Sequence, residues 1–153
     1  MLDASGITSE VFHLSTMIVI KLTTAYGPMT YLQKDGSFAE LLVHKLCLGV
    51  MWLVTSEFNQ IYRARCKNRR DTNILRVTHL CGTLDPCELK DIHLQNRKFT
   101  WCNERRDPTL CKPDSYFRNT YWDLHIENHV LAAPSSSLSG HRPLFLASDH
   151  GLK

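Results

Sequence analysis

The sequence predicts a mixed α/β domain, because stretches with the period of a β-strand alternate with stretches that have the period of an α-helix. Residues 16–26 are rich in β-branched side chains and carry apolar residues on both faces, which is typical of a strand inside a sheet. From Ser37 the apolar residues recur at helical spacing, and residues 50–54 form another apolar strand. This order favours a crossover unit, right-handed if the two strands are parallel, although an antiparallel arrangement stays open.

The elements follow one another with local start and stop signals. The first helix is expected to begin near Ser37, with Ser37 or Asp35 as its cap, and to end at Gly49. Residues 73–84 predict a second amphipathic helix that ends near Pro86. Shorter elements are predicted after it: an aromatic strand at residues 99–101, an extended segment at 109–111, a short helix capped by Asn119, a segment at 130–133 that leads to a serine-rich loop, and a last strand at 143–147.

Composition indicates a folding chain. Of the 153 residues, 43% are hydrophobic and 22% charged, which are globular values, and we expect residues 1–153 to form one domain. The apolar runs are far shorter than the roughly 20 residues that span a bilayer, and the first residues do not resemble a secretory signal. We therefore expect an intracellular protein with no membrane span and no small-molecule cofactor; its oligomeric state is left open.

The six cysteines form no C-x-x-C pair, so reduced thiols are expected rather than a disulfide scaffold. Two histidines and two cysteines could be drawn as a zinc cluster, but their spacing fits no standard finger: His79, Cys81, Cys87 and His93.

Two polar residues follow the end of the predicted strand at residues 50–54. Glu57 and Asn59 are two positions apart, so on an extended chain they point to the same side while Phe58 turns into the core. This arrangement would place them at the edge of a sheet where open α/β folds carry their chemistry, and the alternative is a strand ending in a polar turn. Tyr26 also stands at a strand end, just before Gly27, either leaning into a site or half-buried as an amphipathic residue.

Positive charge is concentrated in one short segment, although the formal net charge of the chain is only +3. A solvated loop and a contact with phosphate backbone are both open for these residues. The segment, called the basic loop below, contains Arg63, Arg65, Lys67, Arg69 and Arg70.

An ordered set of short motifs links these pieces: Tyr-Gly-Pro at residues 26–28, Trp-Leu-Val running to Phe58-Asn59, Phe-Thr-Trp at 99–101 with Asn103, Pro-Thr-Leu before Asp114, and Ser-Gly-His-Arg-Pro-Leu at 139–144. In this order they resemble the C-terminal part of the endonuclease/exonuclease/phosphatase superfamily. More narrowly, residues 16–147 resemble the apurinic-type endonuclease domain of plant non-LTR (LINE-type) retrotransposons.

The resemblance implies a magnesium-dependent phosphodiesterase on a four-layer α/β sandwich, which nicks DNA to prime reverse transcription. It matches Tyr26 to the family's active-site tyrosine and Asn59 to the asparagine of G-D-F-N, which holds the scissile phosphate and the attacking water. Asp114 matches an aspartate that orients neighbouring groups, and His141 matches the histidine of S-D-H, which contacts the phosphate.

Three departures from the family predict an inactive copy. Glu57 replaces the aspartate of G-D-F-N, and a shift of about 1 Å in a carboxylate costs roughly a hundredfold in rate. Gly140 replaces the aspartate of S-D-H, so His141 is expected to be an ordinary imidazole without a carboxylate partner. Residues 1–15 show no counterpart of the family's magnesium-binding glutamate, so we expect no retained metal site and an incomplete, N-terminally truncated sandwich.

Ser148, Asp149 and His150 spell the lost triplet, but they follow the last predicted strand and are interpreted as a coincidence.

The sequence therefore favours a remnant of a retrotransposon-encoded, magnesium-dependent DNA endonuclease without nuclease activity, with DNA as the partner to consider. Two alternatives stay open. One is a non-catalytic nucleic-acid-binding remnant that uses the basic loop, with Lys98, Arg105 and Arg106. The other is an open reading frame with no selected role.

Overall fold

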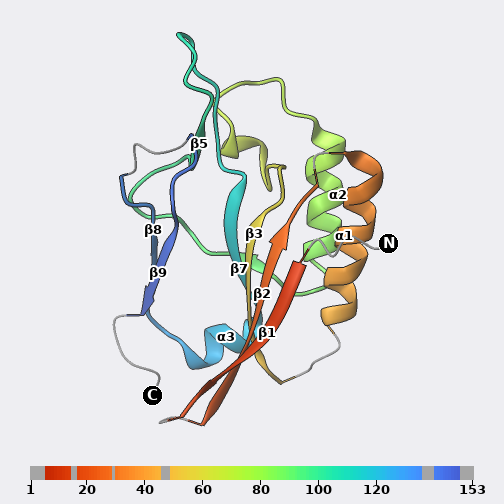
Figure 1. The fold of residues 1–153 in the computed structure, drawn as a ribbon, viewed down its shortest axis with the longest axis vertical. Coiled ribbons are helices and arrows are strands. Elements are labelled where there is room, and N and C mark those ends of the chain that lie inside the picture. Colours follow the sequence, from red (N-terminus) through yellow and green to blue (C-terminus); the bar gives the residue numbers. More distant parts are fainter. Residues whose placement is uncertain (1–5, 15–16, 29, 46–48, 136–139, 149–153) are drawn as a thin grey trace.

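A five-stranded mixed sheet forms the centre of the computed structural model, which describes residues 6–14, 17–28, 30–45, 49–135 and 140–148. The strand order is β1-β2-β3-β7-β4 (Figure 1). Only β2 and β3 run parallel, and the other neighbours are antiparallel. The five strands are β1 (Gly6–His13), β2 (Ile18–Tyr26), β3 (Met51–Glu57), β7 (Asp114–Arg118) and β4 (Lys90–Asp91). The predicted mixed α/β class is confirmed.

Two helices cover one face of this sheet (Figure 1). Helix α1 (Tyr31–His44) connects the parallel strands β2 and β3, so the predicted crossover unit is present, and α2 (Ile74–Leu84) lies beside α1. Their apolar sides join Trp52, Val54 and Phe117 of the sheet in one core. Asn73 caps α2 by accepting a hydrogen bond from the Arg76 backbone N–H, where the sequence predicted the helix to begin.

The predicted start of the first helix is wrong. Helix α1 begins six residues before Ser37, with Thr30 at its N-cap, so both Asp35 and Ser37 lie inside it. The reason is tertiary: Lys34 in the first turns is only 3% exposed, and its Nζ donates to the backbone carbonyls of Phe58 and Asn59. These contacts anchor residues that lack an apolar helical pattern of their own.

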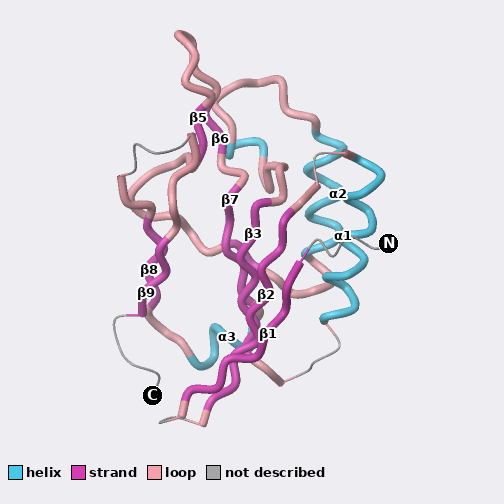
Figure 2. The backbone as a smooth tube through the Cα atoms, viewed as in Figure 1, coloured by secondary structure: helices cyan, strands magenta, loops and turns pink. Residues whose placement is uncertain are grey.

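The opposite face of the sheet is covered by the C-terminal elements α3 (Thr120–His125), β8 (His129–Ala132) and β9 (Phe145–Ser148). Strands β8 and β9 form a separate antiparallel pair (Figure 2). Asn119 caps α3 as predicted, and its side chain also bonds to the backbone of Val50 and Trp52. The described elements therefore form a layer of helices, the large sheet, and a layer that contains the small sheet.

Three strands of the large sheet escaped prediction: β1 and β4 at its two edges, and β7 between β3 and β4. Two further short strands, β5 (Trp101–Cys102) and β6 (Leu110–Cys111), pair with each other close to the predicted aromatic and extended segments. A single 3₁₀ turn, η1 (Ala64–Cys66), lies in the basic loop.

Within the described residues, five cysteines are free thiols, as expected, and no helix is long and apolar enough to cross a membrane. Cys47, Asp149 and His150 lie outside the described residues. The zinc cluster drawn from the sequence is not among the groups that the described residues bring together.

Candidate functional site

Three predicted site residues converge where β3 ends and β7 begins. Glu57 is the last residue of β3 and lies opposite Asp114, the first residue of β7, in the antiparallel ladder. His141 lies on a segment that bridges to Trp101 of β5. Because sheet pairing fixes two of the three backbones, the side chains meet without a long loop to position them.

His141 lies between the two carboxylates. Its Nδ1 is 3.1 Å from Asp114 Oδ2, and its Nε2 is 3.5 Å from Glu57 Oε1. Thr100 donates its hydroxyl to the same Asp114 oxygen at 2.7 Å. The expectation that His141 lacks a carboxylate partner is therefore wrong: Asp114 supplies one from β7, which orients the imidazole.

Gly140 is closely packed, so position 140 is not a vacancy left by a lost aspartate. Its carbonyl accepts a hydrogen bond from the Cys102 N–H, and a Cβ at this position would lie 2.7 Å from the Cys102 carbonyl oxygen. Here the chain runs too close to β5 for a side chain to enter without a shift of the backbone.

Tyr26 and Asn59 lie at and just beyond the ends of the parallel strands β2 and β3 and line the same cavity. Tyr26 is the ladder partner of Glu57. Asn59 has a left-handed backbone, with φ of 48°, and its side-chain amide donates to the Gly27 carbonyl at 2.7 Å. A Cβ on Gly27 would lie 2.2 Å from the Phe58 carbonyl oxygen, so only glycine fits between these segments. Phe58 is 2% exposed and faces the core, as the alternation predicted.

A cavity of about 680 Å³, called the site cleft below, connects most of these residues. Its lining includes five predicted site residues, Tyr26, Glu57, Asn59, Lys67 and His141, and four others that bear on the chemistry, Asp71, Asn73, Arg76 and Trp101. Asp114 is not among the residues that line the cleft. Its carboxylate contacts His141 and Thr100, so Asp114 acts on the cleft through His141.

The structure adds two positioning residues to the predicted set. Thr100 holds Asp114, and Lys34 holds the carbonyls of Phe58 and Asn59. Burial lowers the pKa of Lys34, and two carbonyl acceptors satisfy its ammonium group. One feature of the sequence could have indicated the position of Lys34. It precedes Phe38 by four residues and so lies on the same helix face, and Phe38 packs against Phe58.

Burial also shapes the electrostatics of the cleft. Desolvation raises the pKa of Glu57, the nearby His141 opposes this rise, and the negative charge of Asp114 adds to it. Burial likewise raises the pKa of the Cys111 thiol, to about 11. Cys111 is therefore a neutral thiol at pH 7 and not a nucleophile.

Glu57, Asp114 and His141 could share a cation. Each offers one ligand atom, and these atoms lie within 4.8 Å of one another. Two carboxylates suit a hard divalent cation, with water and substrate oxygens completing its coordination. The donor set therefore fits a divalent metal, contrary to the expectation that no metal site is retained.

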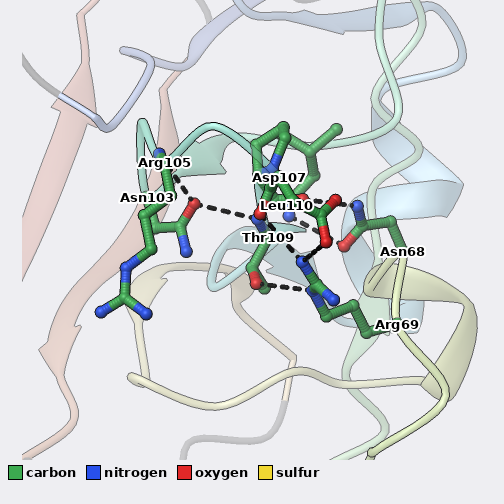
Figure 3. A network of polar contacts seen from close by, with 8 residues as sticks. Asn68, Arg69, Asn103, Arg105, Asp107, Thr109 and Leu110 are labelled. Atoms are coloured by element: carbon green, nitrogen blue, oxygen red, sulfur yellow. Dashed lines mark hydrogen bonds and ion pairs between the residues drawn. The ribbon is translucent and has the colours of Figure 1, made fainter.

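The basic loop is divided among separate surroundings. Arg69 pairs with Asp107 at 2.8 Å and donates to Thr109, which ties the loop to residues 103–110 (Figure 3). Lys67 pairs with Asp71 at 2.9 Å beside the site cleft, and Arg63 and Arg65 face a different cavity. The cations of the basic loop therefore lie in several local environments, and their predicted contact with phosphate backbone stays a prediction.

Comparison with known proteins adds information through structure alone. No model of a protein family and no curated protein matches the sequence. The endonuclease domain of TRAS1, a telomere-specific non-LTR retrotransposon, superposes with a TM-score of 0.69 at 12% identity, covering 95% of this chain and 64% of that domain. The 3'-5' exonuclease NExo from Neisseria meningitidis gives 0.65 at 12% identity, covering 86% and 62%. An AP endonuclease from Archaeoglobus fulgidus gives 0.57 at 9% identity, covering 94% and 70%.

The fold is that of the DNase I-like endonucleases. At these identities the similarity concerns the fold alone, and the chain spans less than two thirds of the TRAS1 domain and of NExo. The DNase I-like fold agrees with the superfamily to which the motifs pointed. Within it, Glu57, Asp114 and His141 occupy one end of the large sheet, beside the site cleft.

Proposed function

We propose that this chain is a decayed retrotransposon-type endonuclease domain, whose site cleft binds a nucleic-acid phosphodiester and a divalent cation without completing hydrolysis. The observation that carries the proposal is the convergence of Glu57, Asp114 and His141 at the wall of the cleft. A bound cation would supply charge neutralisation at a phosphate oxygen. Arg76, which also lines the cleft, adds positive charge for a phosphate, whereas Lys67 is paired with Asp71.

Each residue has a role in this proposal. Glu57 and Asp114 hold the cation, and Asp114 with Thr100 keeps the imidazole of His141 in place. The side-chain NH₂ of Asn59 is held by its bond to the Gly27 carbonyl, so its carbonyl oxygen can accept a hydrogen bond from a water in the cleft. Tyr26 is 55% exposed at the mouth of the cleft, where it can contact a ligand.

The lack of hydrolysis follows from the pairing of Glu57 with His141, because hydrolysis requires each of these groups to act on the substrate or the attacking water. His141 Nε2 lies 3.5 Å from the Glu57 carboxylate, so the imidazole and the carboxylate face each other rather than a substrate. A misplacement of about 1 Å costs roughly a hundredfold in rate. Gly140 is no longer part of this explanation, because Asp114 fills the role of the missing aspartate.

Two measurements on the same protein test the proposal. Millimolar Mn²⁺ or Mg²⁺ should raise the unfolding temperature of the wild type and not that of Asp114→Asn, because the cation stabilises the state that binds it. Supercoiled plasmid should remain intact in Mg²⁺, to the same degree as with His141→Ala. Absence of a cation effect would refute the metal site, and nicking that His141→Ala abolishes would show that the site is active.

A second candidate function is nucleic-acid binding through the cationic residues without catalysis. The observation in its favour is that Arg63 and Arg65 line a basic cavity separate from the cleft. Binding that weakens steeply as salt rises, and that Asp114→Asn leaves unchanged, would support this candidate.

A further inference from the structure

A second cavity, of about 350 Å³, lies beside β4 and the segment that follows it. We call it the basic cavity; its lining includes Arg63, Arg65, Asp91, His93, Arg97, Lys98 and Lys112. It shares no lining residue with the site cleft. Cys111 lines the cleft and Lys112 the basic cavity, as expected for neighbours on an extended chain, whose side chains point to opposite sides.

Positive charge dominates the basic cavity. Five lining side chains are Arg or Lys, and Asp91 is the one carboxylate among the lining residues. Asp91 is already engaged, because Lys112 Nζ lies 2.8 Å and 3.1 Å from its two oxygens. Lys112 is only 6% exposed, so this pair is a fixed part of the wall. The four other cations have no carboxylate of the lining left to neutralise them.

One wall residue carries an unsatisfied donor. The Nε of Arg97 is buried and has no hydrogen-bond partner among the described residues. A buried N–H without an acceptor is destabilising by about 1–3 kcal/mol, so such groups are rare in folded proteins. This Nε has no surface open to solvent, so a phosphate in the cavity would contact Arg97 through its terminal guanidinium nitrogens instead.

Other side chains of the cavity are held in place by aromatic rings. Arg63 lies over the ring of Tyr62 at 5.1 Å, and that ring packs edge-on against the buried Phe117. Lys98 lies over the ring of Phe99 at 5.4 Å. Cations held in this way lose less conformational entropy when a ligand binds.

We propose that the basic cavity binds a phosphate group, with Arg65 and Arg97 as its main ligands. The planar guanidinium fork matches the oxygens of a phosphate, and several such forks around one cavity favour phosphate over a monovalent anion. The phosphate can belong to the backbone of a nucleic-acid strand or to a small phosphate compound. The proposal does not rest on the function of the site cleft, because it needs neither the cation nor Glu57, Asp114 and His141.

The test uses the whole chain in EDTA, so that the site cleft cannot contribute through a metal. Binding of a short fluorescein-labelled DNA duplex is followed by fluorescence anisotropy, and the response to inorganic phosphate is followed by thermal unfolding. The variants are Arg97→Gln and Arg65→Gln; Arg65 is exposed, so its replacement leaves the fold intact even if Arg97→Gln unfolds. Lys45→Gln, at the exposed end of α1, removes the same charge elsewhere.

Each variant should weaken duplex binding about tenfold, the loss expected for one hydrogen bond to a charged group, while Lys45→Gln binds like the wild type. The slope of log K against log salt should fall by about 0.9 per lost phosphate contact. If the variants lose the response to inorganic phosphate but bind the duplex normally, the ligand is a small phosphate compound. If they behave like the wild type with both probes, or if Lys45→Gln weakens binding equally, the proposal is wrong.

Discussion

The site cleft and the basic cavity lie on opposite sides of residues 111–112, and they are built in different ways. Glu57 in the cleft and Asp114, which holds His141 from behind, stand opposite each other at the ends of paired strands. The basic cavity is lined mainly by long side chains from loops. The shape of the cleft is therefore determined by the backbone of paired strands, whereas the shape of the basic cavity depends on the conformations of long Arg and Lys side chains.

This difference predicts a difference in tolerance. A shift of Asp114 disturbs several contacts at once, because its carboxylate contacts both His141 and Thr100. Removing one cation from the cavity leaves four others. We expect changes in the cleft to affect the stability of the fold and changes in the cavity to affect mainly binding.

The largest effect is expected from Asp114→Ala. The variant loses the acceptor of the Thr100 hydroxyl and of the His141 imidazole, and the free energy of unfolding should fall by about 2–3 kcal/mol. Urea denaturation measures this value. The control is Asp107→Ala, whose exposed pair with Arg69 should contribute less than about 1 kcal/mol. Equal losses in the two variants would mean that the contacts around Asp114 do not hold the cleft together.

A somewhat smaller effect is expected from Gly140→Ala. Its Cβ would lie 2.7 Å from the Cys102 carbonyl, and overpacking of this kind destabilises by about 1–3 kcal/mol. The matched control is Gly82→Ala in α2, where a Cβ meets nothing within 4 Å, so this change should stabilise by about 0.5–1 kcal/mol. A stable Gly140→Ala protein would indicate that the chain can move away from β5, and that an aspartate could be accommodated at position 140.

The smallest effect concerns the pH dependence of stability. Because desolvation raises the pKa of Glu57, the folded state holds its proton more tightly than the unfolded state, whose pKa is about 4.5. Wild-type stability should therefore fall relative to Glu57→Gln as the pH rises from about 4.5 through the raised pKa. The difference should stay below about 1 kcal/mol, since the carboxylate is partly exposed and its attraction to His141 opposes the shift.

Unfolding temperatures of the two proteins measured between about pH 4.5 and 7 test this prediction. A wild type that gains stability relative to Glu57→Gln over this range would show that the attraction to His141 outweighs desolvation.

Several parts of the structure followed from local sequence. Alternation predicted that Phe58 lies inside, and Glu57 and Asn59 do line one cavity, although Asn59 reaches it through a left-handed backbone and not through an extended strand. Asn73 and Asn119 cap α2 and α3, because an asparagine side chain can accept from backbone N–H groups within the same turn. These features depend on residues close together in the chain, and the sequence pattern was sufficient for them.

Other parts depended on contacts between distant residues. The strand β7 was missed because five residues with mixed side chains carry little periodic signal, and their pairing with β3 and β4 makes them a strand. The start of α1 was missed because the bonds of Lys34 to Phe58 and Asn59 link residues 24 and 25 positions apart.

The sequence by itself determined the mixed α/β class, the caps of two helices and the set of polar residues at strand ends, because each of these depends on short-range periodicity or on a local hydrogen bond. Tertiary structure alone decided that Asp114 is the partner of His141, that Gly140 has no room for a side chain, and that the basic loop serves different surroundings. The reason is geometric: these outcomes depend on the register of β3 with β7 and on the close approach of residues 140–142 to β5, which no pattern along a single segment encodes.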